Sequence, residues 1–524
     1  AILALKDTCS FRFLVRARDE QAVEKLRRRM EQPDRAFAVM VSDLDMAREV
    51  GAVDEDTSRA LVDPSAPQVL LPRRADEPWL DAVTAYGSEV AVMLPRSPAH
   101  FMLLEDLNEP VVVARAACRD DVIVLENDDA REELMDVADA LLLHDLDLHA
   151  GCEDTVLRIE DGLPVVLRRA SGLAPRPIDL GCEVQPSVAI GSTHEVTIAL
   201  GTGHVMRLSQ PVGDLGSSRA DTTFRRTLDR MLSLWECTPE WIVADPEREA
   251  AARALAVEFG AETILVDHHH AHVASVLAEN RIEGRVLGVS LDSSGRMVDP
   301  ELGSGRFLLV EDDRCRVLEH MPTFRVPGAD AAPRDPWRIA VGLLFDLLGE
   351  DVAAQWAKRL VVDPATADSA LSMLTHDVGC VEVQSFGKLF DVAAALLGVA
   401  RRTATPGAAA RRLQLLAGPP DVITAPAGDP TPVEFLTAWL EELLVRARSS
   451  GDPGEDARWV QRELSGWIAR WSFDLAYEQG LGVVAASGGC FDNPWLRAGF
   501  RTAACTCDIA LALNHQVPDR KSVV

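Results

Sequence analysis

Residues 263–272 read Thr-Ile-Leu-Val-Asp-His-His-His-Ala-His. The apolar run Thr263–Val266 predicts a short buried strand, and the pattern that follows predicts a helix over His268–Glu279. His268 and His272 are four residues apart, so a helix places both imidazoles on one face, one above the other. Two imidazoles placed in this way can share one metal ion. The alternative is a helix start that is merely rich in histidine, but four histidines within five residues favour a metal or phosphate site.

The size and charge of the chain limit its class. Its 524 residues exceed what one hydrophobic core organises, so two or more domains are expected. The net charge is −29 and the sequence pI is about 4.8, which argues against a nucleic-acid backbone or an anionic membrane as the main partner. A nucleotide stays compatible with this charge, because local loops can bind it.

The cysteine pattern bears on metal binding and on compartment. The ten cysteines are scattered and form no Cys-x-x-Cys pair, so a zinc ribbon is not expected. A chain of this length folds without disulfides, which predicts reduced thiols and a cytoplasmic protein. No signal peptide is expected, and no apolar run in the sequence is long enough to span a bilayer. Its first residues, Ile2–Leu5, already read as a strand, as expected for a fragment of a longer protein.

Strands and helices alternate in the first third of the chain and predict an α/β domain. The predicted elements include a helix that begins at Ser97-Pro98, a helix over Arg131–His144, and a hairpin over Leu157–Arg169 that turns at Asp161-Gly162.

A proline-rich linker, Ala174-Pro175-Arg176-Pro177, follows this domain. It predicts a division of the chain into residues 1–180 and 181–524. The second part is expected to start with a hairpin over Val196–Leu208 that turns at Gly201-Thr202-Gly203.

The later sequence predicts a two-lobed α/β fold with a nucleotide cleft. Apolar strands are expected over Arg285–Leu291 and Gly482–Ala486, on either side of a mainly helical region from Trp337 to Gly480. Each of these strands runs directly into a loop of polar and glycine residues, where bound ligands are commonly held.

Two of these loops carry the predicted chemistry. Asp292 enters a Ser293-Ser294-Gly295 turn, where a carboxylate can bind a metal ion. The loop Ser487-Gly488-Gly489 can turn backbone N–H groups toward phosphate or ribose. Either signal alone is weak, because Gly-Gly turns and aspartates at strand ends are common. Together with the histidine pair they predict a site of two imidazoles and one carboxylate, which suits zinc or ferrous iron.

The first part resembles the YrdC-like domain of HypF-type carbamoyltransferases, which act in [NiFe]-hydrogenase maturation. The segments that carry the resemblance, in the same order, are Phe37–Val41, Met93–Pro95, Leu142–Asp145, Leu167–Ala170 and Pro175–Ile178. The resemblance implies a domain that adenylates a carbamoyl or carbamate group. It also implies that Lys6 and Arg158 contact the nucleotide.

The positions that carry chemistry in that domain depart from the family pattern. Lys6 is followed by Asp7-Thr8-Cys9-Ser10 where the family has glycines, and Glu31 lies in the place of a basic phosphate-binding run. Arg115-Ala116-Ala117-Cys118 replaces a Ser-Gly-Asn loop, whereas Cys152-Glu153-Asp154-Thr155 is similar to the family's Cys-Asp-Asp-Ser. These departures leave open a retained fold with weakened or lost adenylation.

The second part resembles the carbamoyl-transferring domain that HypF shares with threonylcarbamoyl and antibiotic O-carbamoyl transferases. Six segments carry this resemblance: Asp267–His272, Leu208–Gln210, Gly213–Leu215, Pro333–Arg338, Phe386–Asp391 and Ser487–Asn493. The resemblance implies the fold of actin/hexokinase-type ATPases. It further implies that His268, His272 and Asp292 bind a metal that holds the nucleotide phosphates. The nucleotide contacts implied are Ser293, Gly295, Ser487, Gly488, Gly489 and Asn493.

A late aspartate that binds the metal in the family has no aligned match, because Asp519 is displaced by two positions. The fold class predicted is therefore α/β, a YrdC-like domain followed by a two-lobed ATPase-like domain, without the family's N-terminal acylphosphatase and zinc-finger modules.

The function implied is ATP-dependent formation of carbamoyl-adenylate from carbamoyl phosphate or carbamate, followed by transfer to a C-terminal cysteine of a HypE-type partner. The implied cofactors are ATP and a divalent metal, zinc or iron, with Mg²⁺ as the ion that accompanies ATP. Two alternatives stay open. One is a partly inactive relative that binds nucleotide or metal in a regulatory role, and the other is a small-molecule O-carbamoyltransferase.

Overall fold

The computed structural model describes residues 1–518, apart from 33–34, 75–76, 86, 117–122, 194–195, 293–304, 312–313, 329–330, 362, 404, 425–427, 429 and 450. The chain forms two compact units. The first comprises Ala1–Ala271, Ala278–Arg281 and Asn514–Val524, and the second comprises His272–Leu277 and Ile282–Leu513. This grouping does not test the expected boundary at residue 180, which stays a prediction.

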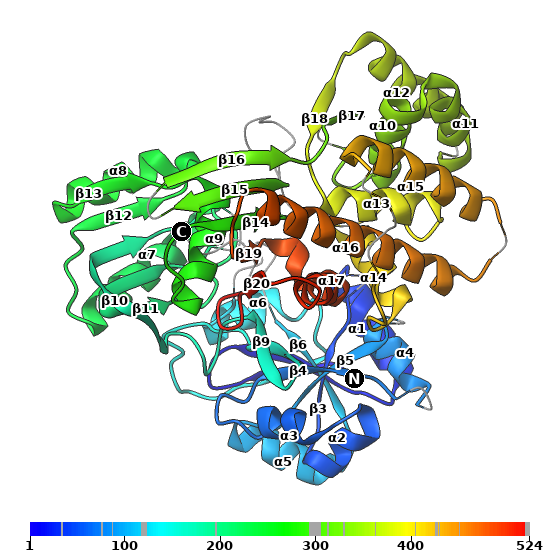
Figure 1. The fold of residues 1–524 in the computed structure, drawn as a ribbon. Helices are drawn as coiled ribbons and strands as arrows, with labels where there is room; N and C mark the ends of the chain where they lie inside the picture. The colour runs from blue at the N-terminus through cyan, green and yellow to red at the C-terminus, as the bar shows by residue number, and fades with distance from the viewer. Residues whose placement is uncertain are drawn as a thin grey trace. The chain divides into compact units, whose positions relative to one another are not determined.

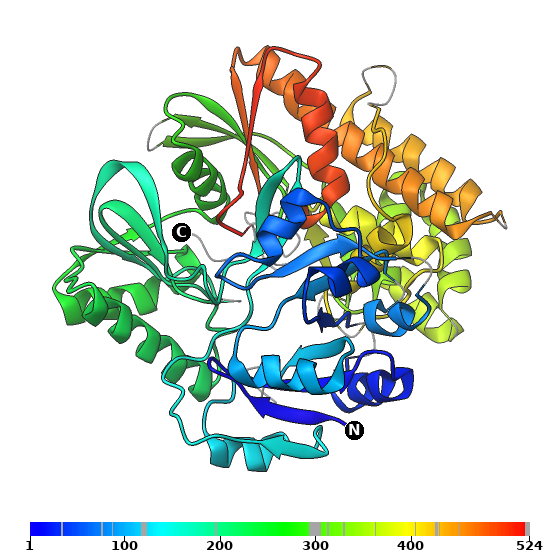
Figure 2. The same cartoon turned by 90° about the horizontal axis from the view of Figure 1, so that it is seen from below.

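The first unit contains a nine-stranded mixed sheet in the order β7-β1-β2-β6-β3-β5-β4-β8-β9. Its strands and helices, coloured blue to cyan, are seen from two sides in Figures 1 and 2. Its strands are β1 (Leu3–Lys6), β2 (Phe11–Arg16), β3 (Ala38–Met40), β4 (Gln68–Pro72), β5 (Glu89–Met93), β6 (Val111–Arg115), β7 (Ala140–Leu142), β8 (Val156–Glu160) and β9 (Leu163–Arg168). Side chains alternate between the faces of a strand. Phe13 and Val15 therefore enter one apolar cluster, whereas Leu14 enters another, so both faces of the sheet are covered.

Short helices cover this sheet, and side-chain caps fix where most of them begin. The helices are α1 (Glu20–Arg29), α2 (Leu44–Val50), α3 (Glu55–Leu61), α4 (Trp79–Thr84), α5 (Pro98–Leu107) and α6 (Asn127–Glu133). Ser97 caps α5, with Pro98 in its first turn, as predicted. The hairpin of β8 and β9 is also confirmed: Asp161 and Gly162 both have positive φ, as its tight turn requires.

A second sheet of the first unit has the order β11-β10-β12-β13. Its strands are β10 (Pro177–Ala189), β11 (Ala199–Leu208), β12 (Trp241–Ala244) and β13 (Glu262–Leu265). Helices α7 (Ser218–Leu234) and α8 (Glu249–Phe259), with the 3-10 turn η1 (Pro246–Arg248), follow in the chain. Leu228 of α7 and Leu255 of α8 pack in one cluster with Ile242 of β12, so both helices cover the same face. β12 and β13 run parallel, so their carboxyl ends lie side by side.

Two predictions of secondary structure in the first unit are wrong. The helix expected over Arg131–His144 ends at Glu133, and residues 140–142 form β7, because they pair in parallel with β1 at the edge of the sheet. The hairpin expected over Val196–Leu208 is a single strand, β11, paired with β10. Gly201 lies inside this strand opposite Ser187, whose Oγ would be 2.5 Å from an added Cβ, so the glycine permits close pairing and makes no turn.

The second unit contains a five-stranded sheet in the order β16-β15-β14-β19-β20. Its strands are β14 (Val286–Ser290), β15 (Arg306–Glu311), β16 (Arg314–His320), β19 (Val483–Ser487) and β20 (Ala510–Leu513), and a separate pair is formed by β17 (Phe324–Pro327) and β18 (Cys380–Val383). Its helices are α10 (Pro336–Leu348), α11 (Glu350–Leu360), α12 (Pro364–His376), α13 (Gly387–Leu396), α14 (Ala408–Ala417), α15 (Pro432–Arg446), α16 (Pro453–Glu478) and α17 (Pro494–Ala504). The mainly helical region predicted between two strands is confirmed; β18 lies inside it and pairs with β17, which precedes it in the chain.

Helix α9 (His268–Asn280) belongs partly to each unit and packs on the five-stranded sheet. Val273 and Val276 of α9 share a small apolar cluster with Val286 of β14 and Ala485 of β19. The next residue of β14, Leu287, enters the main core of the second unit on the opposite face. The sheet is thus enclosed on both faces, and α9 is held against the strands whose ends carry the predicted loops.

Candidate metal site at helix α9

The histidine-rich stretch folds as a strand followed by a capped helix. Residues 262–265 form β13, and α9 begins at His268 as predicted. Asp267 caps the helix, because its Oδ1 accepts hydrogen bonds from the backbone N–H groups of His269, at 2.9 Å, and His270, at 3.1 Å. The expectation that the strand is buried is wrong: β13 is the edge strand of its sheet and is largely exposed.

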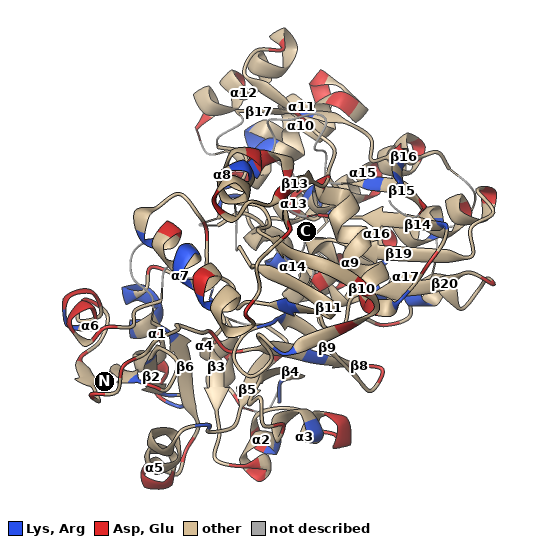
Figure 3. Ribbon diagram, turned by 90° about the vertical axis from the view of Figure 1, so that its left-hand side faces the viewer, with Lys and Arg blue, Asp and Glu red and all other residues tan. Residues whose placement is uncertain are grey.

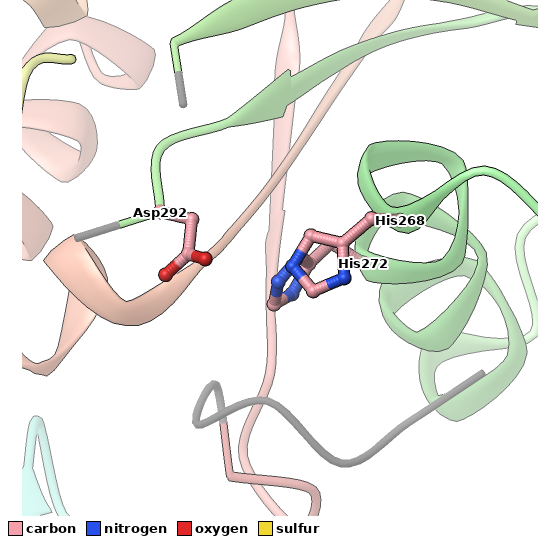
Figure 4. Close-up of side chains that lie close together, drawn as sticks. All are labelled: His268, His272 and Asp292. Carbon is pink, nitrogen blue, oxygen red and sulfur yellow. The ribbon is translucent and has the colours of Figure 1, made fainter. Parts of the chain in front are cut away.

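Two histidines of α9 and one aspartate converge on one point (Figure 4). His268 and His272 lie one turn apart on this continuous helix, and Asp292 follows the end of β14. Ligand atoms of the three side chains all lie within 4.8 Å of one another. His272 and Asp292 are both buried and both belong to the second unit, whereas His268 is partly exposed. The helical spacing places the two histidines together, and the end of β14 brings Asp292 to them, so the three residues named for the metal lie close together.

The loop after β19 supports the backbone at Asp292. β14 and β19 are parallel neighbours, so their carboxyl ends lie at one edge of the sheet. The Leu291 N–H donates to the Ser487 carbonyl at 2.9 Å, and the Cys490 N–H donates to the Leu291 carbonyl at 3.0 Å. Gly488 has φ +108°, and an added Cβ would lie 2.6 Å from the Leu291 carbonyl carbon. Only glycine therefore fits between this loop and the strand end that carries Asp292.

Both histidines make a contact through Nδ1. The Nδ1 atom of His268 is 2.9 Å from Oδ2 of Asp245, and the Nδ1 atom of His272 is 3.4 Å from Oγ of Ser487. Burial acts to raise the pKa of Asp245, but the hydrogen bonds from His268 and from the Glu247 N–H outweigh this effect. The pKa of Asp245 is therefore lower than usual, and this carboxyl stays ionised. With Nδ1 engaged in both rings, Nε2 is the nitrogen of each ring that is suited to a metal.

The residues present fit a metal ion. In a tetrahedral zinc site with bonds of about 2.1 Å, ligand atoms lie about 3.4 Å apart. The ligand atoms of the three side chains are up to 4.8 Å apart, which is more than this value. Side-chain shifts of about 1 Å would bring them to the spacing of a zinc site. Two imidazoles and one carboxylate form a donor set that suits zinc or ferrous iron and leaves a coordination position open for a ligand. Cys490 lies nearby, but burial, together with Asp292, raises the pKa of its thiol well above the ordinary value, so it stays a protonated core residue.

The residues named for nucleotide binding near this site have mixed placements. Ser487 and Gly488 border Leu291 and Asp292, as described above. Asn493 caps α17 by accepting from the Trp495 N–H, and its amide donates to Gln461. Gly489 begins the 3-10 turn η3 (Gly489–Asp492). The remaining named positions, Ser293, Gly295 and the displaced Asp519, lie outside the described residues.

Lys6 and Arg158, the contacts named for the first domain, are both buried in the nine-stranded sheet. Lys6 Nζ donates to the carbonyl of His144 at 3.3 Å. Arg158 makes a two-pronged ion pair with Glu89, through Nε at 3.2 Å and Nη2 at 3.1 Å. Their role as nucleotide contacts stays a prediction.

A buried ion-pair cluster joins residues that lie at or near the ends of strands of the nine-stranded sheet. Arg12 pairs with Asp154 at 2.8 Å, and Arg96 pairs with Asp154 at 2.5 Å and with Asp7 at 2.8 Å. Gln68 donates to the other oxygen of Asp154 at 2.8 Å. Burial acts to raise the pKa of Asp7, but Arg96 and its neighbours lower it to about 2. The carboxylates of Asp7 and Asp154 thus neutralise the guanidinium charges of Arg12 and Arg96.

Sequence reasoning missed Asp245, Arg12 and Arg96. Asp245 could have been found, because it follows β12 just as Asp267 follows the parallel neighbour β13, and residues after adjacent parallel strands meet at one sheet edge. Arg12 and Arg96 are far apart in sequence and have no distinguishing spacing. Their pairing depends on strand order, which the local pattern does not specify.

Three family models match consecutive parts of the chain. Residues 1–170 match the model described as "Telomere recombination", which covers the Sua5, YciO and YrdC proteins. Residues 183–279 match the "HypF Kae1-like domain", and residues 288–520 match the "Carbamoyltransferase, Kae1-like Domain, second subdomain".

Full-length comparisons agree with these models. The carbamoyltransferase HypF of Rhizobium leguminosarum bv. viciae is 32% identical over 516 residues, which are 96% of this chain and 66% of that protein. A carbamoyltransferase HypF homolog of Cupriavidus necator is 30% identical over 353 residues, 64% of this chain and 89% of that protein. The crystal structure of full-length HypF in the phosphate- and nucleotide-bound form superposes with a TM-score of 0.88 at 26% identity, covering 99% of this chain and 82% of that one.

These matches confirm the predicted fold class, a YrdC-like α/β domain followed by a two-lobed ATPase-like domain. The chain spans about two thirds of the length of the Rhizobium relative. Within the described part of the chain, no helix combines the length and the apolar character needed to cross a membrane.

Proposed function

Because the chain belongs to the HypF family of carbamoyltransferases, we propose that it transfers a carbamoyl group from a nucleotide-activated intermediate, with the transfer centred on His268, His272 and Asp292. The observation that carries this proposal is the convergence of the three side chains beside the Gly488 loop. No other group of at least three histidine, cysteine or acidic residues with metal-site geometry occurs among the described residues.

A divalent metal bound there would supply positive charge for the nucleotide phosphates and for the leaving phosphate. His268 and His272 would hold it through Nε2, and Asp292 would hold it through a carboxylate oxygen. Zinc and iron suit these ligands, and Mg²⁺ is the ion expected to accompany ATP.

The charge of the protein makes such a local centre necessary. The net charge is −29, and acidic residues are spread over helices of both units, for example in the first turns of α6 and α11 (Figure 3). A field of this sign repels ATP and carbamoyl phosphate at long range. Binding must therefore depend on short-range groups, namely a metal ion, backbone N–H groups and individual cations.

In the first domain we propose Lys6 and Arg158 as the contacts for ATP and the carbamoyl donor, carbamoyl phosphate or carbamate. Lys6 carries a buried ammonium group that donates a long hydrogen bond, 3.3 Å, to the backbone carbonyl of His144, so an anion bound there would gain a close cation. The acceptor proposed for the transferred group is the C-terminal cysteine of a HypE-type partner. Its thiolate would attack the carbamoyl carbon as AMP leaves.

A second candidate function is carbamoyl transfer, or nucleotide binding, without adenylation. The buried cluster of Arg12, Arg96, Asp7 and Asp154 favours it, because guanidinium groups already neutralised by carboxylates attract a triphosphate weakly. Under this alternative the first domain retains its fold as a scaffold.

One experiment separates the two candidates. Purified protein is incubated with ATP, carbamoyl phosphate and labelled pyrophosphate, and exchange of label into ATP is followed. In parallel, bound metal is measured by elemental analysis, and transfer to a peptide with the C-terminal cysteine of a HypE-type protein is followed by mass spectrometry. Exchange together with transfer supports the full reaction. Metal binding without exchange supports the second candidate, and a protein that shows neither metal binding nor transfer contradicts both.

A further inference from the structure

We propose that Asp245 is a positioning residue for the metal site: it fixes His268 in the tautomer and orientation that present Nε2 to the metal. This role rests on the proposed function of His268 as a metal ligand. The contact itself, between Oδ2 of Asp245 and Nδ1 of His268 at 2.9 Å, lies wholly within the first unit.

Both carboxylate oxygens of Asp245 are committed. Asp245 is 4% exposed and directly follows β12. Oδ1 accepts a hydrogen bond from the Glu247 N–H at 3.1 Å and so caps the turn η1, while Oδ2 meets His268. The backbone therefore holds one oxygen and thereby aims the other at the imidazole. A side chain clamped at both oxygens can set the plane of the ring that it contacts.

The chemistry of the pair determines which ring nitrogen is left for the metal. An ionised carboxylate only accepts hydrogen bonds, so the imidazole must donate from Nδ1. A neutral imidazole with a proton on Nδ1 carries its lone pair on Nε2. Hydrogen bonding to a carboxylate also makes the ligating nitrogen more basic, as in other carboxylate–histidine–metal arrangements.

A purely structural role is the competing explanation, because Asp245 also caps η1. Asp245→Asn separates the two roles. The asparagine Oδ1 can still accept from the Glu247 N–H, so the cap is kept. Its NH₂ group then faces Nδ1 of His268 and can only donate, which forces the proton of the imidazole onto Nε2. Nε2 of His268 could then no longer bind the metal, whereas the turn η1 would be kept.

The test measures metal affinity on the full chain. Metal-free wild-type protein and variants are titrated with Zn²⁺ in competition with a chromophoric chelator, and Co²⁺ absorption spectra report the ligand geometry. Asp43→Asn is the capping control, because Oδ1 of Asp43 accepts from the Met46 N–H at the start of α2 and Asp43 contacts no histidine in any hydrogen bond of the described residues. Melting temperatures of all variants are recorded alongside.

We expect Asp245→Asn to weaken Zn²⁺ binding by about 10- to 100-fold, to change the Co²⁺ spectrum and to leave the melting temperature close to that of the wild type. Asp43→Asn should leave both metal readouts unchanged. Equal Zn²⁺ affinities for wild type and Asp245→Asn would overturn the role assigned to Asp245. A wild-type protein that binds no Zn²⁺ and no Co²⁺ would overturn the metal site itself, so the two failures are distinguishable.

A double-mutant cycle covers the case in which Asp245→Asn folds poorly. If Asp245 acts on the metal through His268, then in a His268→Ala background the change Asp245→Asn should cause no further loss of metal affinity per folded molecule. Fully additive losses in the two backgrounds would show that Asp245 acts independently of His268, which contradicts its positioning role.

Discussion

Replacing Gly488 by alanine should damage both the fold of the second unit and the metal site. Gly488 has φ +108° and ψ +154°, a region that is essentially restricted to glycine and costs other residues about 1–3 kcal/mol. The added Cβ would also lie 2.6 Å from the carbonyl carbon and oxygen of Leu291 and 2.9 Å from the nitrogen of Asp292. All three are backbone atoms, so no side chain can rotate away, and overpacking of this kind costs about 1–3 kcal/mol more.

The two terms together predict a loss of about 2–6 kcal/mol in the free energy of unfolding. Any relaxation must move the backbone at Asp292, so the carboxylate is displaced from His268 and His272. We therefore expect a lower midpoint of urea unfolding together with a weaker affinity for Zn²⁺. Tryptophan fluorescence can follow the transition, because Trp467 and Trp495 are buried in the core of the second unit.

Gly482→Ala is the matched control for this prediction. Gly482 directly precedes β19, the strand that Gly488 follows, and an added Cβ at Gly482 would meet no atom within 4 Å. This variant should be within about 1 kcal/mol of the wild type, or slightly more stable, since alanine restricts the unfolded chain. The reasoning is refuted if Gly488→Ala unfolds at the same urea concentration as Gly482→Ala and binds Zn²⁺ as tightly.

Three further predictions concern the metal, the buried ion pairs and the first domain. His272→Ala should release Zn²⁺ during dialysis, because it removes a buried ligand. His376→Ala, at the exposed end of α12, should retain the metal. Elemental analysis measures the metal content, and equal content in the two variants would contradict the site. The pKa of Asp7 is lowered from 3.8 to about 2, so its contribution of about 2 kcal/mol is complete above pH 4 and is lost as pH falls toward 2. In acid-unfolding curves Asp7→Asn should therefore lose less stability than the wild type between pH 4 and 2, and parallel curves would refute this assignment. Lys6→Met should reduce the rate of ATP–pyrophosphate exchange at least tenfold, because it removes a buried cation from the proposed nucleotide site. Lys25→Met, at an exposed ion pair, should leave the rate unchanged. Equal exchange rates for the two variants would exclude Lys6 as a nucleotide contact.

The parts of the site that were predicted from sequence are those set by local geometry. His268 and His272 were found because helical spacing alone puts them on one face, and the loops at Asp292 and Ser487 were found because each directly follows an apolar strand. That β14 and β19 are neighbours, which brings these loops together, was not predicted, because no local pattern specifies which strands pair.

The errors arose where pairing between distant segments decided the structure. Gly201 and Gly203 read as a turn, but residues 199–207 pair with a long partner strand, β10, and irregularities in the register are accommodated within this pair. Residues 140–142 were assigned to a helix, but they pair in parallel with β1 and form the strand β7. Asp245 was overlooked because its contact with His268 is 23 residues away in sequence and depends on the parallel pairing of β12 and β13.

The most direct test of the proposed site is a crystal structure of the Zn²⁺- or Fe²⁺-loaded protein, with anomalous diffraction recorded at the metal edge. We predict a single strong anomalous peak about 2.0–2.2 Å from Nε2 of His268, Nε2 of His272 and a carboxylate oxygen of Asp292. A peak bound through Nδ1 of either histidine, or a loaded metal located away from these three side chains, would contradict the site on which the proposed function rests.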